Sequence, residues 1–139
     1  MNNYVVVGDA DAIIYLHLRN DVLHEKAKKI SKRLYSSGSS VIFPNTALIE
    51  AITTFQRKLS KSHLAEFLIE QYNSNAFEIE YVDEKMMKIA ISFFDPTGSK
   101  QNTFFDGIVA ACARILSADA IFSFDTFYKK KGFKLASDL

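Results

Sequence analysis

Acidic side chains occur at four places in the chain where a predicted strand ends or a predicted helix begins. They are Asp9 with Asp11, Glu50, Asp106 and Asp125. Asp9 follows the β-branched run Val5–Val7, which indicates a buried strand, and Asp125 follows a second apolar run, 120–124. In a parallel α/β sheet, the carboxyl ends of the strands and the amino ends of the helices share one edge. We therefore expect the acidic segments to meet at that edge, although the chain separates them widely.

Carboxylates that converge without a partner repel one another, and the pKa of at least one of them rises. A bound divalent cation removes this repulsion. An all-oxygen set of Asp and Glu, with no clustered His or Cys, favours Mg²⁺ or Mn²⁺ over zinc. Such a cation lowers the pKa of a bound water, positions a phosphate and stabilises the leaving oxygen. The predicted chemistry is therefore hydrolysis of a phosphodiester bond.

Each acid also has an ordinary structural explanation. Asp9 and Asp11 suit a turn or a helix cap, and Thr103-x-x-Asp106 has the form of a capping box. Glu50 could be a solvent-facing helix residue paired with a neighbour at helical spacing. Asp125 could cap the short helical turn that follows it. Four independent structural explanations at one sheet edge are less economical than one shared site.

Strands alternate with helices along the chain, and this order defines the fold class. The runs predicted as strands are 5–7, 41–43, 77–82, 120–124 and 133–135. The segments predicted as helices are about 11–18, 24–34, 46–58, 62–72, 83–94, 103–116 and 127–131, with Asn45 or Thr46 expected to cap the third. Strict alternation in 77–82 favours an edge strand. We predict one α/β domain over residues 1–139, a three-layer α/β/α fold with a mostly parallel sheet of four to five strands.

The composition is typical of a globular protein. The chain has 139 residues, of which 48% are hydrophobic and 24% charged, and its formal net charge is +1. A sum this close to neutral can hide an acidic pocket ringed by basic patches. Cys112 is the only cysteine, so no internal disulfide can form. With no apolar leader and no run near the roughly 20 residues of a membrane span, we expect a soluble protein in the cytoplasm.

Together, the acidic segments resemble those of the PIN-domain nucleases, most closely the small stand-alone VapC toxins of type II toxin–antitoxin systems. The segments that carry the resemblance are Val5–Leu16, Pro44–Glu50, Thr103–Ala113 and Ser123–Tyr128. They occur in the family's order and span nearly the whole chain. Asp11 stands where the family usually has Asn or Ser, and Ser123 and Tyr128 replace the commoner Thr and Phe.

The resemblance implies an endoribonuclease that binds one or two Mg²⁺ or Mn²⁺ ions, uses water as the nucleophile and leaves 5′-phosphate and 3′-hydroxyl ends. It assigns Asp9, Glu50 and Asp106 as the principal metal ligands, while Asp125 would support a second ion or hold metal-bound waters. The residues expected to orient these carboxylates are Asp11, Thr103 and Ser123. The resemblance also implies a homodimer and an antitoxin partner that covers the active site.

RNA can approach a negative pocket only if nearby cations guide its phosphates. The candidate cations are Arg57, Lys58, Lys129, Lys130, Lys131 and Lys134. The basic run 26–33 instead occupies the polar side of an amphipathic helix, where we expect a solvated face. Unpaired bases could stack on Phe104, Phe105 or Tyr128, although each of these residues also suits the core.

Three other functions remain open at the level of the sequence. The Asp9-x-Asp11 pattern after a strand also resembles the haloacid-dehalogenase phosphatases, in which the first Asp is a covalent nucleophile, but Glu50 has no role there. A PIN-domain nuclease of RNA processing would carry the same acids as a toxin. A non-catalytic PIN module that binds RNA or protein would keep the fold, and a lack of affinity for divalent metals would favour it.

Overall fold

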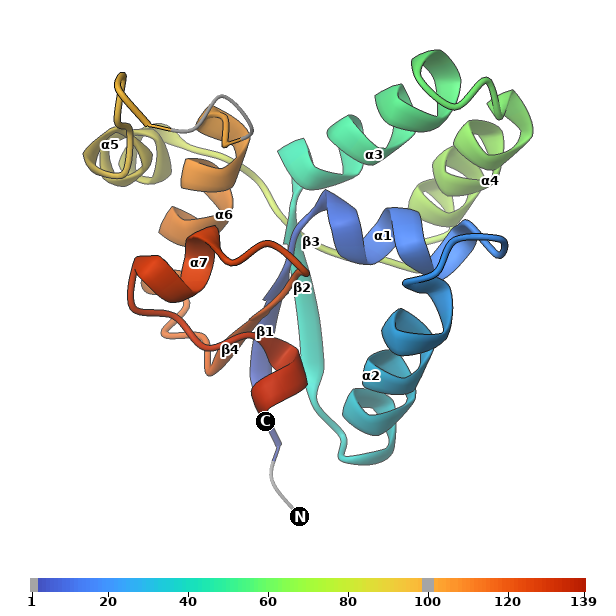
Figure 1. Ribbon diagram of the computed structural model, residues 1–139, viewed down its shortest axis with the longest axis horizontal. Helices are drawn as coiled ribbons and strands as arrows, with labels where there is room; N and C mark the ends of the chain where they lie inside the picture. The colour runs from blue at the N-terminus through green and yellow to red at the C-terminus, as the bar shows by residue number, and fades with distance from the viewer. Residues whose placement is uncertain (1–2, 99–101) are drawn as a thin grey trace.

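The computed structural model describes residues 3–98 and 102–139, and a parallel sheet of four strands forms its centre (Figure 1). The strands are β1 (Val5–Gly8), β2 (Ser40–Pro44), β3 (Glu78–Glu80) and β4 (Ala120–Phe122). Their spatial order is β3-β2-β1-β4, and each neighbouring pair is parallel. In the central strand, Val6 pairs with Val41 on one side and with Ala120 on the other.

Seven α-helices and one 3₁₀ helix surround the sheet in the described residues. They are α1 (Ala10–His17), α2 (His24–Ser36), α3 (Asn45–Arg57), α4 (Ser62–Asn73), α5 (Glu84–Ser92), α6 (Phe104–Ile115), α7 (Phe127–Lys130) and the 3₁₀ helix η1 (Ala136–Asp138). Helices α1–α4 lie on one side of the sheet and α5–α7 on the other (Figure 1). The predicted three-layer α/β/α fold is therefore confirmed. None of these helices is long and apolar enough to cross a membrane.

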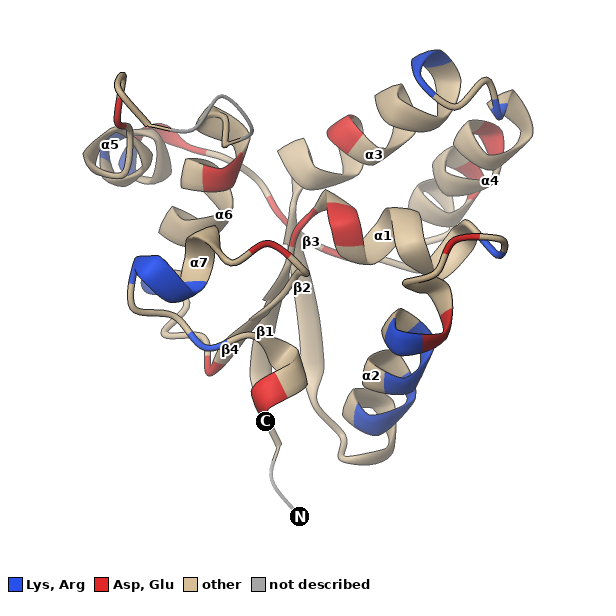
Figure 2. Ribbon diagram, in the orientation of Figure 1, with Lys and Arg blue, Asp and Glu red and all other residues tan. Residues whose placement is uncertain are grey.

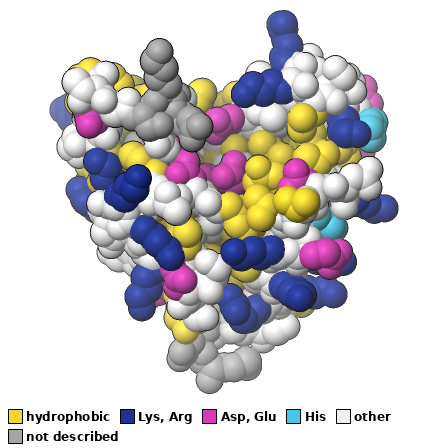
Figure 3. All heavy atoms as spheres, viewed as in Figure 1, with side chains coloured by type: hydrophobic (Ala, Val, Ile, Leu, Met, Phe, Trp, Pro, Cys, Tyr) yellow, Lys and Arg dark blue, Asp and Glu magenta, His cyan; other side chains and the backbone are white. Residues whose placement is uncertain are grey.

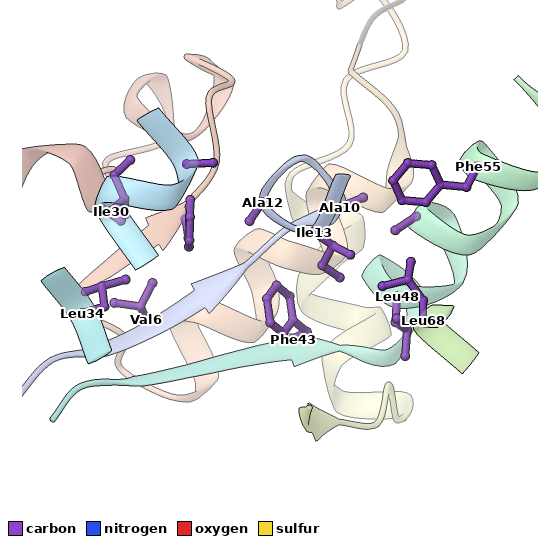
Figure 4. Close-up of a cluster of buried hydrophobic side chains, with 14 of the residues drawn as sticks. Val6, Ala10, Ala12, Ile13, Ile30, Leu34, Phe43, Leu48, Phe55 and Leu68 are labelled. Atoms are coloured by element: carbon purple, nitrogen blue, oxygen red, sulfur yellow. The ribbon is translucent and has the colours of Figure 1, made fainter. Parts of the chain in front are cut away.

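Two apolar cores hold the layers together, one on each face of the sheet. Val6 belongs to the core beneath α1–α4 and Val7 to the core beneath α5 and α6, because successive side chains of a strand point to opposite faces. In the first core, Ile13 of α1 and Leu48 of α3 pack around Phe43 of β2 (Figure 4). Full burial of one such side chain contributes about 1.5–3 kcal/mol relative to leaving it exposed. These cores fix the positions of β1, α1 and α3, which carry three of the acids.

The predicted fifth strand, 133–135, is wrong. Only Leu135 forms a bridge, to Ile121, and it is an isolated one. Gly132, with φ of 92°, turns the chain after α7, and η1 begins at Ala136. Between these two features Leu135 alone is bridged to the sheet, so residues 133–135 form no ladder. The predicted edge strand at 77–82 is confirmed at its edge position, although its ladder covers only 78–80.

The cap predicted for α1 is narrowed to one residue, and the cap predicted for α3 is wrong. Asp9 caps α1 by accepting the N–H of Asp11, so the cap is Asp9 and Asp11 lies in the first turn. At the start of α3, the cap position is held by Pro44, which has no side-chain hydrogen bond to give. Asn45 and Thr46, the predicted caps, lie inside the helix instead. The side chain of Asn45 accepts a backbone N–H from the segment after β3.

Candidate active site

The acidic segments meet at the carboxyl-terminal edge of the sheet. β1 ends directly before Asp9, and β4 ends three residues before Asp125. α3 follows β2 without a loop and carries Glu50 in its second turn, while α6 presents Asp106 in its first turn. Acidic positions of α1, α3 and α6 gather near the middle of the molecule, between the two groups of helices (Figure 2).

Asp9 is the most enclosed of these acids, with only 5% of its surface exposed. Its Oδ1 accepts the N–H of Asp11 at 2.8 Å, and its Oδ2 accepts the hydroxyl of Tyr128 at 2.9 Å. Burial, followed by the charge of Asp11, raises the pKa of Asp9 well above its ordinary value. Hydrogen bonds from Ser123 and Tyr128 act in the opposite direction. Asp9 is thus both the cap of α1 and a buried acid.

Asp106 has both a capping role and a place in the acidic group. Its Oδ2 accepts the N–H of Thr103 at 2.9 Å, which completes a capping box at the start of α6. Its Oδ1 lies 3.3 Å from the hydroxyl of Tyr128. Burial is the main cause that raises its pKa, and the charge of Asp125 adds to it. The capping explanation is correct for this residue, and it leaves Oδ1 turned toward the other acids.

Asp125 likewise combines a structural bond with a contact to the group. Its Oδ1 accepts the N–H of Phe127 at 2.9 Å in the turn before α7, and the cap position of that helix is held by Thr126 rather than by Asp125. Its Oδ2 accepts the side-chain amide of Asn102 at 2.9 Å. The same amide lies 3.4 Å from Asp106. Asn102 therefore links the acid after β4 to the acid at the start of α6.

The charges of other acids help to raise the pKa values of Asp11 and Glu50. Burial raises the pKa of Asp11 to about 6, and the charges of Asp125 and Asp106 contribute. Burial also raises the pKa of Glu50 to about 7, again with contributions from Asp106 and Asp11, while Lys58 lowers it. Glu50 is therefore half-buried among like charges and is no ordinary solvent-facing helix residue.

Ser123 and Thr103, which the resemblance assigns to orienting the carboxylates, both accept backbone N–H groups of the acidic segments. Ser123 is buried, and its Oγ accepts the N–H of Asp125 at 3.1 Å. Hydrogen bonding from Ser123 lowers the pKa of both Asp9 and Asp11. The Oγ1 of Thr103 accepts a backbone N–H in the first turn of α6 at 3.3 Å.

The donor chemistry of this group fits a hard divalent cation. The gathered groups are carboxylates, and a cation would relieve the repulsion that contributes to their raised pKa values. In the described parts of the chain, however, no three His, Cys, Asp or Glu side chains form a ready ligand group. Mg²⁺ is commonly held by one or two carboxylates while it keeps several waters, and that mode needs no complete protein cage.

The predicted cations lie on both sides of the acids (Figure 2). Arg57 ends α3 and Lys58 follows it, and both are exposed. Lys58 is close enough to Glu50 for its charge to lower the pKa of that acid. This pair of cations therefore borders the acids on the α3 side.

The second group of cations lies on and after α7. Lys129 forms an ion pair with Asp138 at 3.2 Å, and Lys131 lies over the ring of Phe127, 5.6 Å from its centroid. Lys130 is exposed and makes no ion pair within residues 3–98 and 102–139. Lys134, further along the chain, is also exposed. Among Lys129, Lys130 and Lys131, Lys130 is therefore the best placed to bind an RNA phosphate.

Two residues of the site were not assigned to it from the sequence. Asn102 gave no signal, because an amide in a loop has no pattern that points to distant carboxylates. Tyr128 was considered as a platform for base stacking, and this is wrong, because its side chain is fully buried. The only feature of the sequence that could have indicated its role is the hydroxyl of Tyr128, at a position where the resemblance to the family leads us to expect Phe. Of the other two aromatic candidates, Phe105 is 42% exposed and Phe104 is half-buried against Phe94.

The fold and the acids define an α/β/α protein with a carboxylate-rich site at the carboxyl edge of a parallel sheet. The model of the PIN domain family matches residues 6–134, and the chain belongs to that family. Among solved structures, the chain is similar to the crystal structure of VapC20 from Mycobacterium tuberculosis, described as a sarcin-ricin loop cleaving toxin. The two are 21% identical with a TM-score of 0.76, and the match covers 92% of this chain and 95% of that chain. Among curated proteins, no sequence matches the chain.

Membership in the PIN domain family sets aside the phosphatase alternative.

Proposed function

We propose that the chain is a divalent-metal-dependent endoribonuclease. The observation that carries the proposal is the gathering of carboxylates from four separate segments at one sheet edge, where burial first and neighbouring acids second raise the pKa values of Asp9, Asp11, Glu50 and Asp106. Acids brought together without cationic partners destabilise a fold, so their presence calls for a functional reason. Membership in the PIN domain family supports the same activity.

In this proposal Asp9, Glu50 and Asp106 hold a Mg²⁺ or Mn²⁺ ion, and Asp125 supports a second ion or its bound waters. A bound ion of this kind supplies an activated water and stabilises the leaving oxygen of the phosphodiester. The residues that keep the carboxylates in position are Asp11, Thr103, Ser123 and Asn102. The cations on either side of the acids receive the RNA phosphates.

We further propose that the nuclease is the toxin of a type II toxin–antitoxin pair and acts in the cytoplasm. The support is the structural likeness to VapC20, a toxin described as cleaving the sarcin-ricin loop. In such a pair an antitoxin protein covers the acids, and the toxin works as a homodimer. A role in RNA processing is the alternative within the same family.

The activity is tested by incubating total RNA with the purified protein and Mg²⁺ or Mn²⁺. We expect internal cleavage with new 5′-phosphate ends, loss of cleavage with EDTA, and recovery when the metal is restored. Glu50→Gln and Asp9→Asn should each lower the rate by about a hundredfold or more. Glu66→Gln, which changes an exposed glutamate of α4, is the matched control and should leave the rate unchanged. Cleavage that survives in Asp9→Asn would refute the site.

The toxin role is tested by inducing the chain in a bacterial host, alone and with the reading frame that neighbours its gene. We expect growth arrest that the neighbour's product relieves and that Asp9→Asn abolishes. Normal growth together with cleavage of a defined precursor RNA would favour the processing role. Sedimentation of the purified protein, alone and with the neighbour's product, measures the proposed dimer and complex.

A further inference from the structure

Tyr128 connects two acids that come from distant parts of the chain. Its hydroxyl lies 2.9 Å from Oδ2 of Asp9, at the end of β1, and 3.3 Å from Oδ1 of Asp106, in the first turn of α6. The ring is fully buried in the core beneath α5 and α6. A phenol hydroxyl has one proton to donate, so the two carboxylates share it in a three-centre arrangement.

Each of the two carboxylates is also held at its other oxygen by a helix start. Oδ1 of Asp9 accepts the N–H of Asp11 at 2.8 Å, and Oδ2 of Asp106 accepts the N–H of Thr103 at 2.9 Å. A carboxylate held at one oxygen can still rotate about its Cβ–Cγ bond. A carboxylate held at both oxygens cannot, and its remaining lone pairs keep one direction. Tyr128 attaches the second oxygen of both acids at once, and at Asp9 a hydrogen bond from Ser123 adds to it.

We infer that Tyr128 is a positioning residue, whose hydroxyl fixes the carboxylates of Asp9 and Asp106 in the orientation that receives the divalent ion. This inference rests on the proposed function. A phenylalanine would fill the same space in the core but would remove one hydrogen bond from the carboxylate of each acid. The effect of the hydroxyl is therefore on the orientation of the two acids and is separable from the packing of the ring.

The test compares wild type with Tyr128→Phe, which removes the hydroxyl and keeps the ring. Tyr72→Phe is the matched control, because it removes a hydroxyl that bonds to Tyr81 on an exposed part of the surface. Binding of Mn²⁺ is measured without RNA, from the electron paramagnetic resonance signal of the free ion. Cleavage of a short single-stranded RNA is then followed as a function of Mn²⁺ concentration. Thermal unfolding checks that each variant is folded.

We expect Tyr128→Phe to bind Mn²⁺ about tenfold more weakly than wild type, as is usual when a residue that orients a metal ligand is lost. Half-maximal cleavage should require correspondingly more Mn²⁺, while kcat at saturating metal and KM for RNA stay close to wild type. Tyr72→Phe should behave as wild type in every measurement. Wild-type Mn²⁺ affinity in a folded Tyr128→Phe would overturn the inference.

If Tyr128→Phe does not fold, a variant with 4-aminophenylalanine at position 128 replaces it in the test. The ring amine again donates a proton to the acids, so wild-type Mn²⁺ affinity supports the inference and a tenfold loss overturns it. Failure of the proposed function gives a different result, because wild type itself would then neither bind Mn²⁺ nor cleave RNA, and the inference would fall with it. Cleavage of RNA by wild type without metal would likewise overturn the inference, because the two acids would then have no ion to receive.

Discussion

At the scale of single residues, the site stores unfavourable electrostatic energy in the folded protein. Asp11 and Glu50 lose solvent on folding and gain like charges as neighbours, and both effects raise their pKa values. A folded protein that favours the protonated form of an acid is destabilised when that acid ionises. The acids of the site therefore lower the stability of the metal-free protein, and this loss of stability should depend on pH.

Glu50 should make the stability of the metal-free protein fall as the pH rises. Its pKa goes from an ordinary value of 4.5 to about 7 in the folded state. Between these two values the unfolded chain has released the proton that the folded chain retains, so rising pH favours unfolding. We expect the Tm in EDTA to decrease from pH 5 to pH 8. In Glu50→Gln the decrease should be smaller and the Tm at pH 8 higher than in wild type.

Scanning fluorimetry across this pH range measures the effect, with Glu66→Gln as the control that keeps the wild-type slope. Asp11, whose pKa rises to about 6, adds a similar slope at lower pH that persists in both variants. An unchanged slope in Glu50→Gln would show that the carboxyl is not desolvated among like charges.

The acids, and Thr103 and Ser123 beside them, could be named from the sequence, whereas the contacts of Asn102 and Tyr128 with the acids could not. Asp9 follows β1 directly and Asp125 lies three residues after the end of β4, so the strand pattern indicates where both acids lie. Tyr128 and Asn102 form hydrogen bonds with residues that are distant in sequence, such as the bond from Tyr128 to Asp9. The sequence around each of them has no pattern that predicts these contacts. An aromatic residue between Phe127 and three lysines indicates only a half-buried turn.

At the scale of secondary structure elements, one glycine determines how β1 approaches β2. A Cβ added at Gly8 would lie 2.1 Å from Cε1 of Phe43, whose ring is buried in the first core. Gly8→Ala forces this ring or the end of β1 to move, and overpacking of this kind costs about 1–3 kcal/mol. We expect a lower free energy of unfolding in urea, and also a lower nuclease rate, because Asp9 follows directly.

The combined variant Gly8→Ala with Phe43→Leu serves as the control, since the smaller side chain makes room for the added methyl group. Its loss of stability should be less than the sum of the two single losses. Additive losses would mean that the overlap between Gly8 and Phe43 does not limit the packing.

The capping box of α6 should matter for both stability and activity. Thr103→Ala removes the side-chain acceptor at the start of the helix, and loss of a cap costs about 1 kcal/mol. The same change loosens the turn that orients Asp106, so cleavage should fall more than stability alone explains. Thr103→Ser keeps the hydroxyl and should retain both properties. Urea unfolding and cleavage rates measure the two effects, and a stability loss in Thr103→Ala with full activity would separate the cap from the site.

Most elements follow from local patterns, and the exceptions have local causes as well. Val5–Val7 and the amphipathic helices are set by side-chain periodicity, which the fold preserves. The run 133–135 is also predicted as a strand, but it lies between the turn at Gly132 and the 3₁₀ helix at Ala136 and forms only one bridge. Strand pairing depends on how the chain enters and leaves the sheet, and composition alone does not reveal that.

At the scale of the whole molecule, the charge is nearly balanced and its distribution is uneven. The formal net charge is +1. Acidic side chains gather on one face beside a stretch of hydrophobic surface, and Lys and Arg side chains surround them at a distance (Figure 3). A polyanion gains little from the net charge of such a protein. Its attraction to this face must come from a few cations near the acids, and these should dominate the salt dependence of binding.

Lys130 is the cation whose contribution to the salt dependence of RNA binding is most readily measured. We expect Lys130→Ala to weaken binding of a short single-stranded RNA and to reduce the slope of log affinity against log salt by about 0.7, the value for one lost phosphate contact. Fluorescence anisotropy in the Asp9→Asn background measures binding without cleavage, and in active protein KM should rise while kcat stays near wild type. Lys32→Ala, on the exposed side of α2, is the control and should leave the slope unchanged. Equal effects of the two variants would mean that RNA responds to net charge alone, and that the lysines of α7 do not form its path to the acids.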